Sequence, residues 1–344
     1  MPEALGRSLY LSESHGIPAD LGPAGVPVFL SLHREEEMNE DWKEHMVQFC
    51  EQLHARGCRI LADISKRTLA AMQVSSVLEL SRMLHLWAVR TDYGFTLEEI
   101  KAIAEELPVV LNASVLTEAE MQELQSCRWK MAMHNFYPRP ETGLDAEYLK
   151  ERTDLLHQYG FKVLAFIPGT GNKRGPLKEG LPTLEAHRAL PLLCAYADLV
   201  LNFGIDQVYV GDPELEESER KRICRLIDEG ILELPCTLRN GYEDLYEQVF
   251  TNRLDSPRQL IRAAESREYS VSSQRRVKPA VPECRRRGTI TMDNEKYLRY
   301  EGELMIVRED FPADERVNVI GAVNAEYLPL TDWIPRGGKF RLTR

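Results

Sequence analysis

The sequence predicts a barrel of eight parallel strands surrounded by helices, an α/β fold of the TIM-like (β/α)8 type, followed by a small β domain. From Gly6 to about Glu229, short apolar runs alternate with amphipathic stretches, which is typical of a parallel sheet covered by helices. After Pro235 the pattern changes to hairpin-length strands separated by turns. A chain of 344 residues has room for one large and one smaller domain. We therefore expect domains at residues 1–234 and 235–344.

Eight apolar runs are the predicted strands of the barrel. They lie at residues 7–13, 26–33, 58–65, 84–92, 108–114, 129–137, 162–169 and 207–212. The stretches 39–57, 96–107 and 146–160 have apolar residues at helical spacing, several with an acidic first turn and a closing glycine, so they predict helices. Eight such units in this length fit a (β/α)8 barrel.

The first connection departs from this pattern. Residues 14–26 hold Gly or Pro at five positions, and these residues oppose a regular helix. We expect a short irregular connection between the first two strands.

The second domain is predicted from four further strand candidates. They lie at residues 288–293, 302–309, 317–327 and 338–344. The turns between them are rich in Asp, Asn, Pro and Gly, which indicates a small β barrel or sandwich. The basic, proline-containing segment 269–288 is either a connection or an irregular first strand.

Composition narrows the classes of function. The net charge of −11 argues against a general nucleic-acid binder, because phosphate backbones are bound through an excess of Lys and Arg. The apolar runs are too short for a membrane helix, and the first residues resemble no signal peptide, so we expect a cytoplasmic protein without a membrane partner. The seven scattered cysteines contain no CxxC pair and are expected to be reduced and mostly buried.

Polar residues gather at the predicted carboxyl ends of the strands, where barrel enzymes carry their active sites. These residues are Glu13, His33, Asp63, Asp92, Asn112, Ser114, His134, Asn135, Tyr137 and Asp212. Such a ring suits a hydrophilic substrate. Several of these Asp and His residues could also form a metal site, although no HxH or HExxH spacing supports one, and no cofactor is expected.

The segment after the seventh strand, GTGNKRGPLKEGLPTLEAHR (169–188), is rich in Gly and Pro and suits close approach to a ligand. Lys173, Arg174 and Arg188 could bind a phosphate or carboxylate there. We expect a helix to begin near Pro182, with Glu185 in its first turn, where a carboxylate is either functional or a structural cap.

Several motifs together resemble the 6-phospho-N-acetylmuramidases of bacterial cell-wall recycling. The motifs are GRSLYLSE, ILADIS, RTDYGF, LNAS, HNFYPRPETGL, GLPTLEAHR, RYEGELMI and DERVNVIGAV. The resemblance implies a TIM-like barrel with a cyclophilin-like β domain, and hydrolysis of N-acetylmuramic acid 6-phosphate linked to N-acetylglucosamine. It also implies site roles for Asp63, Asp92, Asn112, His134, Asn135, Tyr137 and Glu185. The spacing LYLSE departs from the family pattern and leaves Glu13 outside this set.

Glycoside hydrolysis generally uses two carboxyl groups, and Asp92 and Glu185 are the predicted pair, with Asp63 in reserve. The apolar neighbours of Glu185 are expected to raise the pKa of its carboxyl toward that of a working acid. Attack by the substrate's own acetamido oxygen is an alternative route.

The predicted partner is a phosphorylated amino-sugar disaccharide, bound through Asp63, Asn112, His134, Asn135, Tyr137, Arg174 and Arg188. A homodimer is compatible with this interpretation. The second domain, through Arg285–Arg287, Asp293 and Asn294, is expected either to complete the pocket or only to stabilise the barrel. The competing functions are a metal-dependent barrel amidohydrolase and a non-catalytic carbohydrate-binding protein.

Overall fold

The computed structural model describes residues 4–11, 17–18, 21, 24–32, 41–91, 94–269 and 276–344. The chain divides into two compact units, Met1–Cys224 and Arg225–Arg344. This division falls earlier than the one expected after residue 234. The reason is that strand β9 (Ile231–Leu238) pairs with β14 (Val317–Val323) and β15 (Lys339–Thr343), both in the second unit.

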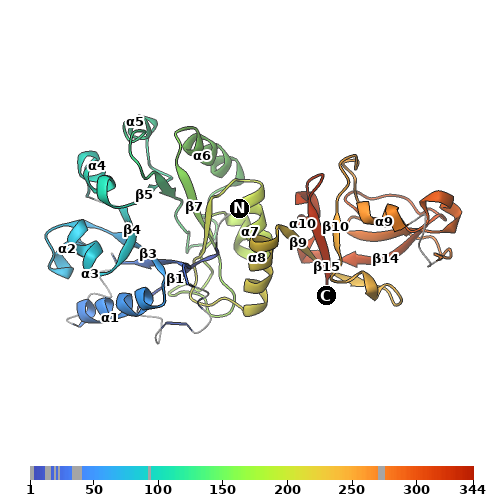
Figure 1. Ribbon diagram of the computed structural model, residues 1–344, viewed down its shortest axis with the longest axis horizontal. Helices are drawn as coiled ribbons and strands as arrows, with labels where there is room; N and C mark the ends of the chain where they lie inside the picture. The colour runs from blue at the N-terminus through green and yellow to red at the C-terminus, as the bar shows by residue number, and fades with distance from the viewer. Residues whose placement is uncertain are drawn as a thin grey trace. The chain divides into compact units, whose positions relative to one another are not determined.

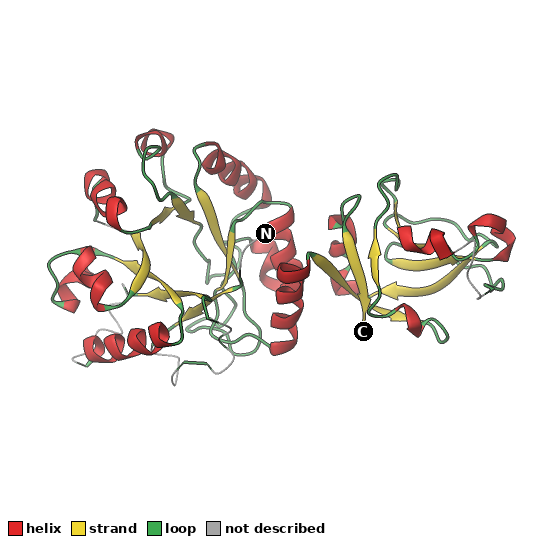
Figure 2. Ribbon diagram, viewed as in Figure 1, coloured by secondary structure: helices red, strands yellow, loops and turns green. Residues whose placement is uncertain are grey.

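The first unit contains a closed barrel of eight parallel strands, as the sequence predicts. The strands are β1 (Gly6–Leu9), β2 (Pro27–Ser31), β3 (Arg59–Ile64), β4 (Leu86–Thr91), β5 (Val109–Asn112), β6 (Met131–Met133), β7 (Lys162–Ile167) and β8 (Gln207–Val210). Each pairs with the next along the chain, and β8 pairs with β1 to close the ring. Figures 1 and 2 show the helices of this unit around the outside of the strands.

The helices of the described part of the first unit are α1 (Trp42–Ala55), α2 (Lys66–Met72), α3 (Val77–Met83), α4 (Leu97–Glu106), α5 (Glu118–Glu123), α6 (Ala146–Gln158), α7 (Leu192–Leu201) and α8 (Glu217–Glu229), the last crossing into the second unit. Three of them, α1, α4 and α6, lie within the predicted ranges 39–57, 96–107 and 146–160. The acidic first turns act as caps: at α4, the Thr96 hydroxyl accepts from the backbone N–H of Glu99, whose carboxylate accepts from Thr96 N–H. None of the described helices is long and apolar enough to cross a membrane. The irregular connection expected at 14–26 lies largely outside the described residues.

The barrel core is apolar and filled by inward side chains of alternate strand residues. The core side chains are Phe29, Leu61, Ala88, Val110, Met131, Met133, Leu164, Phe166 and Tyr209. The rings of Phe29 and Phe166 meet edge to face with centroids 5.2 Å apart. At Gly6 the packing leaves no room for a side chain, because a Cβ atom would lie 2.4 Å from the Tyr209 ring. The barrel is therefore closed through its middle, and ligands can bind only at its ends.

The second unit is a seven-stranded sheet in the order β10-β15-β9-β14-β12-β13-β11. The strands not yet given are β10 (Val249–Thr251), β11 (Leu260–Arg262), β12 (Thr289–Asp293) and β13 (Leu304–Val307), and the α-helices of this unit beyond α8 are α9 (Ala264–Tyr269) and α10 (Pro329–Trp333). The four predicted strands are confirmed, whereas β9, β10 and β11 were not foreseen. A bridge between Asn252 and Ala263 links the ends of the two edge strands, so the sheet curls toward a barrel. The cyclophilin-like character stays a prediction.

The basic segment before β12 is a connection rather than a strand over its described part. Residues 276–288 contain neither helix nor strand, apart from an isolated bridge between Arg285 and Phe311. Val277 is nevertheless buried, and its backbone N–H donates to the Glu301 carboxylate at 2.8 Å. This segment therefore packs against its own unit.

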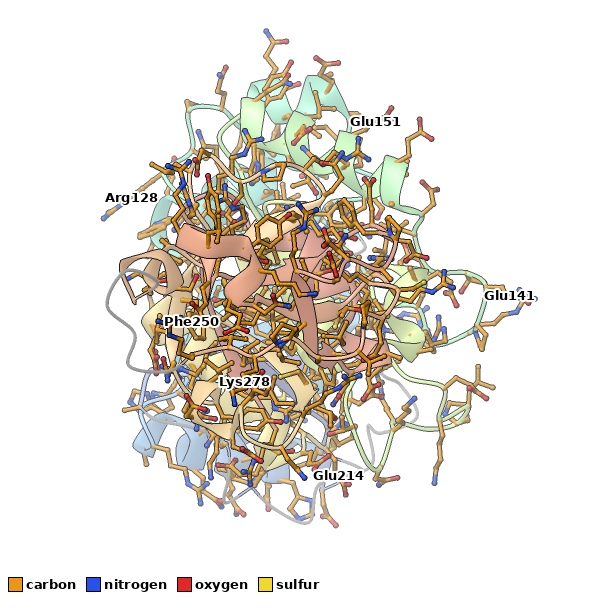
Figure 3. All side chains as sticks on the ribbon, turned by 90° about the vertical axis from the view of Figure 1, so that its right-hand side faces the viewer. Arg128, Glu141, Glu151, Glu214, Phe250 and Lys278 are labelled. Carbon is orange, nitrogen blue, oxygen red and sulfur yellow. The ribbon has the colours of Figure 1, made fainter. Side chains whose placement is uncertain are left out.

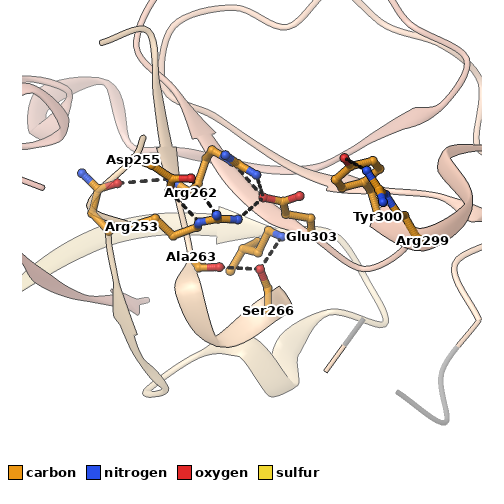
Figure 4. Close-up of polar contacts among 10 residues, drawn as sticks. Arg253, Asp255, Arg262, Ala263, Ser266, Arg299, Tyr300 and Glu303 are labelled. Carbon is orange, nitrogen blue, oxygen red and sulfur yellow. Dashed lines mark hydrogen bonds and ion pairs between the residues drawn. The ribbon is translucent and has the colours of Figure 1, made fainter. Parts of the chain in front are cut away.

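A buried carboxylate organises the inside of the second unit (Figure 4). Glu303 is 2% exposed and forms ion pairs with the guanidinium groups of Arg262 and Arg253. Asp293 is also buried, and one of its carboxyl oxygens has no hydrogen-bond partner. Burial, together with the nearby carboxylates of Glu303 and Asp314, raises the pKa of Asp293 to about 8. Asp293 therefore holds a proton in the folded unit at neutral pH.

This proton predicts a pH-dependent stability for the second unit. An unfolded Asp loses its proton near pH 3.8, so the folded state binds more protons between that pH and about 8, and stability falls as pH rises through this window. Asp293→Asn removes the ionisation and is expected to raise the unfolding temperature of this unit by about 4 °C or more at pH 8.

Thermal unfolding followed between pH 4 and pH 8 measures this effect. Asp228→Asn, which changes an exposed carboxylate of the same unit, is the matched control and should change little. A gain in the Asp293 variant that is the same at every pH would contradict the assignment.

Candidate active site

Polar side chains replace the apolar core at the carboxyl ends of the strands. Asp63 of β3 and Arg90 of β4 are register partners, each two residues beyond a core residue, so both face into the barrel. Nη1 of Arg90 donates to Oδ1 of Asp63 at 2.9 Å, and Nη2 donates to Oδ1 of Asn135 at 2.5 Å. Both charged side chains are about 5% exposed. The arrangement joins β3, β4 and the residues after β6 in one hydrogen-bonded group.

Arg90 is the member of this group that the sequence interpretation missed. A signal was present, because Arg90 is a charged residue inside an apolar strand and lies two positions after Ala88. Alternation along a strand places such a residue on the same side as the core residues, where a charge needs a partner. Asp63 and Asn135, which the sequence did predict, are those partners.

The loop after β7 is held in place by a buried carboxylate. Asp212 is fully buried and accepts hydrogen bonds from the backbone N–H groups of Gly169 (2.8 Å), Arg174 (3.0 Å) and Leu181 (3.1 Å). Three backbone donors on one carboxylate fix both ends of the loop. Asp212 therefore shapes the loop rather than binding a ligand directly.

Arg174 occupies a different position in the same loop. Its guanidinium carbon lies 3.9 Å from the ring centroid of Tyr10, which follows β1, and 5.5 Å from that of Phe136, which follows β6. The side chain forms no ion pair with any carboxylate in the described part of the chain, and its Nε is buried without a hydrogen-bond partner. Aromatic contacts thus hold a cation at the carboxyl end of the barrel.

Glu185 and Arg188 form a pair that clamps two loops together. The expected helix from Pro182 is absent: Glu185–Ala189 is a short 3-10 helix, η2, and α7 begins only at Leu192. The Glu185 carboxylate accepts two hydrogen bonds of 2.7 Å from Arg188 and one each from the backbone N–H groups of Glu141 (2.9 Å) and Gly143 (2.8 Å). A Cβ atom at Gly143 would lie 2.6 Å from the Glu185 carboxylate, so the contact requires glycine.

These bonds correct two expectations. The hydrogen bonds from Arg188 and from the two backbone groups lower the pKa of Glu185 to about 2, so the expectation that apolar neighbours raise this pKa is wrong. Arg188 also donates to the carbonyl oxygens of Gly180 and Tyr137, each at 3.0 Å. Its donors are thus used within the protein, which disagrees with the predicted role of Arg188 in binding substrate.

The His134 side chain points away from the barrel core. Met131 and Met133 face the barrel core, so the next side chain along, His134, faces outward. It is fully buried, neither ring nitrogen has a hydrogen-bond partner, and desolvation with the nearby charge of Arg152 in α6 lowers its pKa to about 3. A neutral, buried imidazole on the helix side of the barrel disagrees with the predicted contact to substrate.

The other predicted residues are placed as follows. Asn112 ends β5, and its side-chain oxygen accepts from the backbone N–H of Ser114 at 3.1 Å. Tyr137 is half-buried, and its backbone N–H donates to the carbonyl of Pro182 at 2.9 Å. Glu13, His33 and Asp92 lie outside the described residues. Within the described residues, no group of three or more His, Cys, Asp or Glu side chains is arranged to hold a metal ion.

The polar residues proposed for the second domain have partners in their own unit. Arg286 pairs with Asp310 at 2.7 Å, and Arg287 pairs with Asp332 at 2.5 Å. Arg285 donates to the carbonyl of Pro312 at 3.0 Å and lies over the Phe311 ring. The Asn294 amide donates to the carbonyl of Glu315 and to the Asn318 side chain, both at 2.9 Å. Arg174 is therefore a better candidate for an anion ligand than these arginines.

Comparison with known proteins decides the family. The N-terminal model of the 6-phospho-N-acetylmuramidase family matches residues 19–225, and the C-terminal model of the same family matches residues 232–343. The chain belongs to the 6-phospho-N-acetylmuramidase family. The family name denotes a glycosidase, and the match extends over both units.

Two solved structures resemble this 6-phospho-N-acetylmuramidase family member over its whole length. A conserved protein of unknown function from Enterococcus faecalis is 30% identical, with a TM-score of 0.83 over 99% of this chain and 96% of the other. An uncharacterized B. cereus protein is 22% identical, with a TM-score of 0.81 over 100% of both chains, and this second likeness shows the fold alone. No curated protein matches the sequence.

The clamp predicts an acid-sensitive stability for this family member. The pKa of Glu185 lies at about 2 in the folded protein against an ordinary 4.5, so its ion pair stabilises the fold above about pH 4.5, and this contribution is lost as pH falls toward 2. Glu185→Gln is expected to lower the unfolding temperature by a few degrees at pH 7, since each kcal/mol shifts it by about 2–4 °C in a domain of this size.

Thermal unfolding at pH 7, 5 and 3 checks this expectation. The difference between wild type and Glu185→Gln should shrink at the lowest pH, whereas Glu179→Gln, at an exposed site in the same loop, should match wild type throughout. A Glu185 variant as stable as wild type at pH 7 would show that the clamp does not stabilise the barrel.

Proposed function

We propose that this chain hydrolyses the glycosidic bond between N-acetylmuramic acid 6-phosphate and N-acetylglucosamine, in the cytoplasm and as part of cell-wall recycling. The observation that carries the proposal is the match of both family models, to residues 19–225 and 232–343. The polar group at the carboxyl end of the barrel suits a sugar substrate, because hydroxyl and acetamido groups need hydrogen-bond partners when they leave water.

We assign the acid-base chemistry to Asp92. Hydrolysis of a glycoside requires a proton for the leaving oxygen and a group that assists attack at the anomeric carbon. Asp92 follows Arg90 by two residues in the sequence, and Arg90 is part of the inward polar group. Glu185 does not suit the acid role, because a carboxylate that accepts four hydrogen bonds and has a pKa of about 2 carries no proton to donate. In this proposal Glu185 is a positioning residue for the loop at 139–143.

The group that assists attack is either a second carboxylate or the substrate itself. Asp63 is the candidate carboxylate, since it faces inward and is held by Arg90 at 2.9 Å. The alternative is the acetamido oxygen next to the cleaved bond, in which case the protein only orients that group. Both routes end with water adding to the anomeric carbon, so the products are the same two sugars.

Arg174 is the proposed ligand of the phosphate. The phosphate brings a charge of about −1.5 to −2 to a protein with a net charge of −11, so binding requires local cations. Arg174 meets this need because it has no ion-pair partner in the described residues and is held against Tyr10 and Phe136. A guanidinium presents several donors to phosphate oxygens at once.

The first test of the proposal is substrate preference. Purified protein is expected to release N-acetylglucosamine from the 6-phosphorylated muramyl disaccharide much faster than from the unphosphorylated one. The reason is that the Arg174 guanidinium has no anionic partner when the substrate lacks the phosphate. Arg174→Gln is expected to raise KM for the phosphorylated substrate at least ~10-fold and to leave the slower reaction unchanged, since a charge-assisted hydrogen bond contributes about 1.5–3 kcal/mol.

The control for this test is Arg82→Gln, which removes an exposed cation on α3. It should change neither reaction. Equal rates on the two disaccharides would contradict phosphate recognition. Equal loss on both substrates in the Arg174 variant would show that Arg174 shapes the site without contacting the phosphate.

The second test concerns the chemical step. Asp92→Asn is expected to lower kcat by at least ~10²-fold, which is the usual contribution of a positioned acid-base group, while KM changes little. Asp154→Asn, which changes an exposed aspartate in α6, provides the control for a loss of one negative charge. Near wild-type turnover in the Asp92 variant, with the fold intact by circular dichroism, would remove Asp92 from the mechanism.

A further inference from the structure

A cavity opens at the amino end of the barrel, opposite the end that carries the candidate active site. Its volume is about 410 Å³, and its wall includes the first residues of five strands: Pro27, Arg59, Met131, Lys162 and Gln207. Its floor is made by core residues such as Leu164 and Tyr209. None of its lining residues belongs to the candidate active site, and the barrel core lies between the two.

The wall of this amino-end cavity carries a concentration of positive charge. Four cationic side chains line it, namely Arg59, Arg128, Lys130 and Lys162, against a single carboxylate, that of Asp206. The carboxylate is already engaged, because Asp206 accepts hydrogen bonds from the backbone N–H of Val163 at 2.7 Å and from His157 at 2.9 Å. In a protein with a net charge of −11, such a cavity is a local region of positive charge, which attracts anions.

Two of these cations have donors that no described residue uses. The ammonium group of Lys162 makes no hydrogen bond or ion pair with the described residues, and the side chain is exposed. Arg128 makes none either, and its guanidinium carbon lies 4.7 Å from the ring centroid of Trp129. Figure 3 shows the Arg128 side chain extending away from the ribbon. Both cations are therefore free to bind a ligand's anionic oxygens.

The cavity also has flat aromatic surfaces. Trp87 and Trp129 both line it, and Trp129 is 37% exposed. Arg59 lies over the Trp87 ring, with its guanidinium carbon 5.4 Å from the centroid, and its Nε donates to the Gly25 carbonyl at 3.0 Å. Tryptophan faces can stack with the ring of a ligand, and the neighbouring guanidinium groups attract a phosphate attached to that ring. The volume lies within the range of small-molecule sites.

We propose that the amino-end cavity binds a phosphorylated ring compound, with its phosphate on Lys162 and Arg128 and its ring on the tryptophans. Both a nucleotide and a sugar phosphate have this chemistry. The site is separate from the catalytic one because the closed apolar core lies between them. Its occupation does not depend on the reaction that the other end of the barrel performs.

Binding to the full chain tests this proposal, with adenosine monophosphate, glucose 6-phosphate, glucose and inorganic phosphate as probes. Calorimetry and tryptophan fluorescence are the measurements, since two of the four tryptophans line the cavity. Either phosphorylated ring compound should bind with a Kd below about 1 mM and at least ~10-fold more tightly than glucose or phosphate alone. Tighter binding of the nucleotide assigns the ring site to a base, and tighter binding of glucose 6-phosphate assigns it to a sugar.

Variants locate the site. Lys162→Gln and Trp129→Ala are each expected to weaken binding at least ~10-fold, while Lys43→Gln, at a half-buried lysine of α1 that does not line the cavity, leaves it unchanged. Binding should persist in Arg174→Gln, which separates this site from the proposed phosphate ligand of the active site. The binding result is therefore independent of whether the chain hydrolyses the phosphorylated disaccharide.

Three outcomes overturn the proposal. The first is no saturable binding of any phosphorylated probe up to about 10 mM. The second is binding that Arg174→Gln abolishes and Lys162→Gln does not affect, which assigns the ligand to the active site. The third is that wild type binds none of the probes while the Lys162 and Trp129 variants sediment differently from wild type. That result would make this surface a contact between copies of the chain.

Discussion

The ion pair of Asp63 and Arg90 is the interaction on which the carboxyl end of the barrel depends. A charge inside a strand barrel is costly unless it is paired and hydrogen-bonded, and here each of the two is about 5% exposed. The parallel register sets the two residues directly opposite each other on β3 and β4. The second guanidinium nitrogen of Arg90 donates to the side-chain oxygen of Asn135, so the residues after β6 are bonded to the same pair. A polar floor is thus built on top of an apolar core.

Two further carboxylates shape the loops above this floor. Asp212 fixes the loop after β7 by accepting hydrogen bonds from three backbone N–H groups. Glu185, which also binds Arg188, joins η2 to the loop at 141–143 by accepting from the backbone N–H groups of Glu141 and Gly143. Glu185 was expected to be the catalytic acid and Asp212 was one of the polar residues expected at the strand ends, but both carboxylates accept hydrogen bonds from backbone N–H groups. The consequence is a rigid rim on which Arg174 is held by aromatic rings. Rigid supports of this kind suit the proposed recognition of a phosphate, because a cation already in place loses little conformational entropy on binding.

The same strands give the barrel two chemically different ends. The first residues of several strands are cationic or polar, the middle residues are apolar, and the last ones form the ion pair and its neighbours. Because side chains alternate along a strand, inward residues two apart form successive layers. The apolar layer at Phe29 and Phe166 closes the passage between the ends. The proposed active site and the proposed amino-end site therefore do not compete for space.

The sequence by itself determined the eight strands of the barrel, three of the helices around them (α1, α4 and α6) and four strands of the second unit. These features depend on apolar periodicity, caps and turn residues, which act over a few neighbouring positions. It also brought Asp63 and Asn135 to the carboxyl end, because both lie near the carboxyl ends of predicted strands. Only the tertiary structure decided that Arg90 pairs with Asp63, that His134 faces away from the barrel core, that the Glu185 carboxylate binds the backbone of Glu141 and Gly143, and that β9 belongs to the second sheet. Each of these depends on strand register or on a partner distant in the chain, and local sequence patterns carry no information about which distant group a side chain will meet.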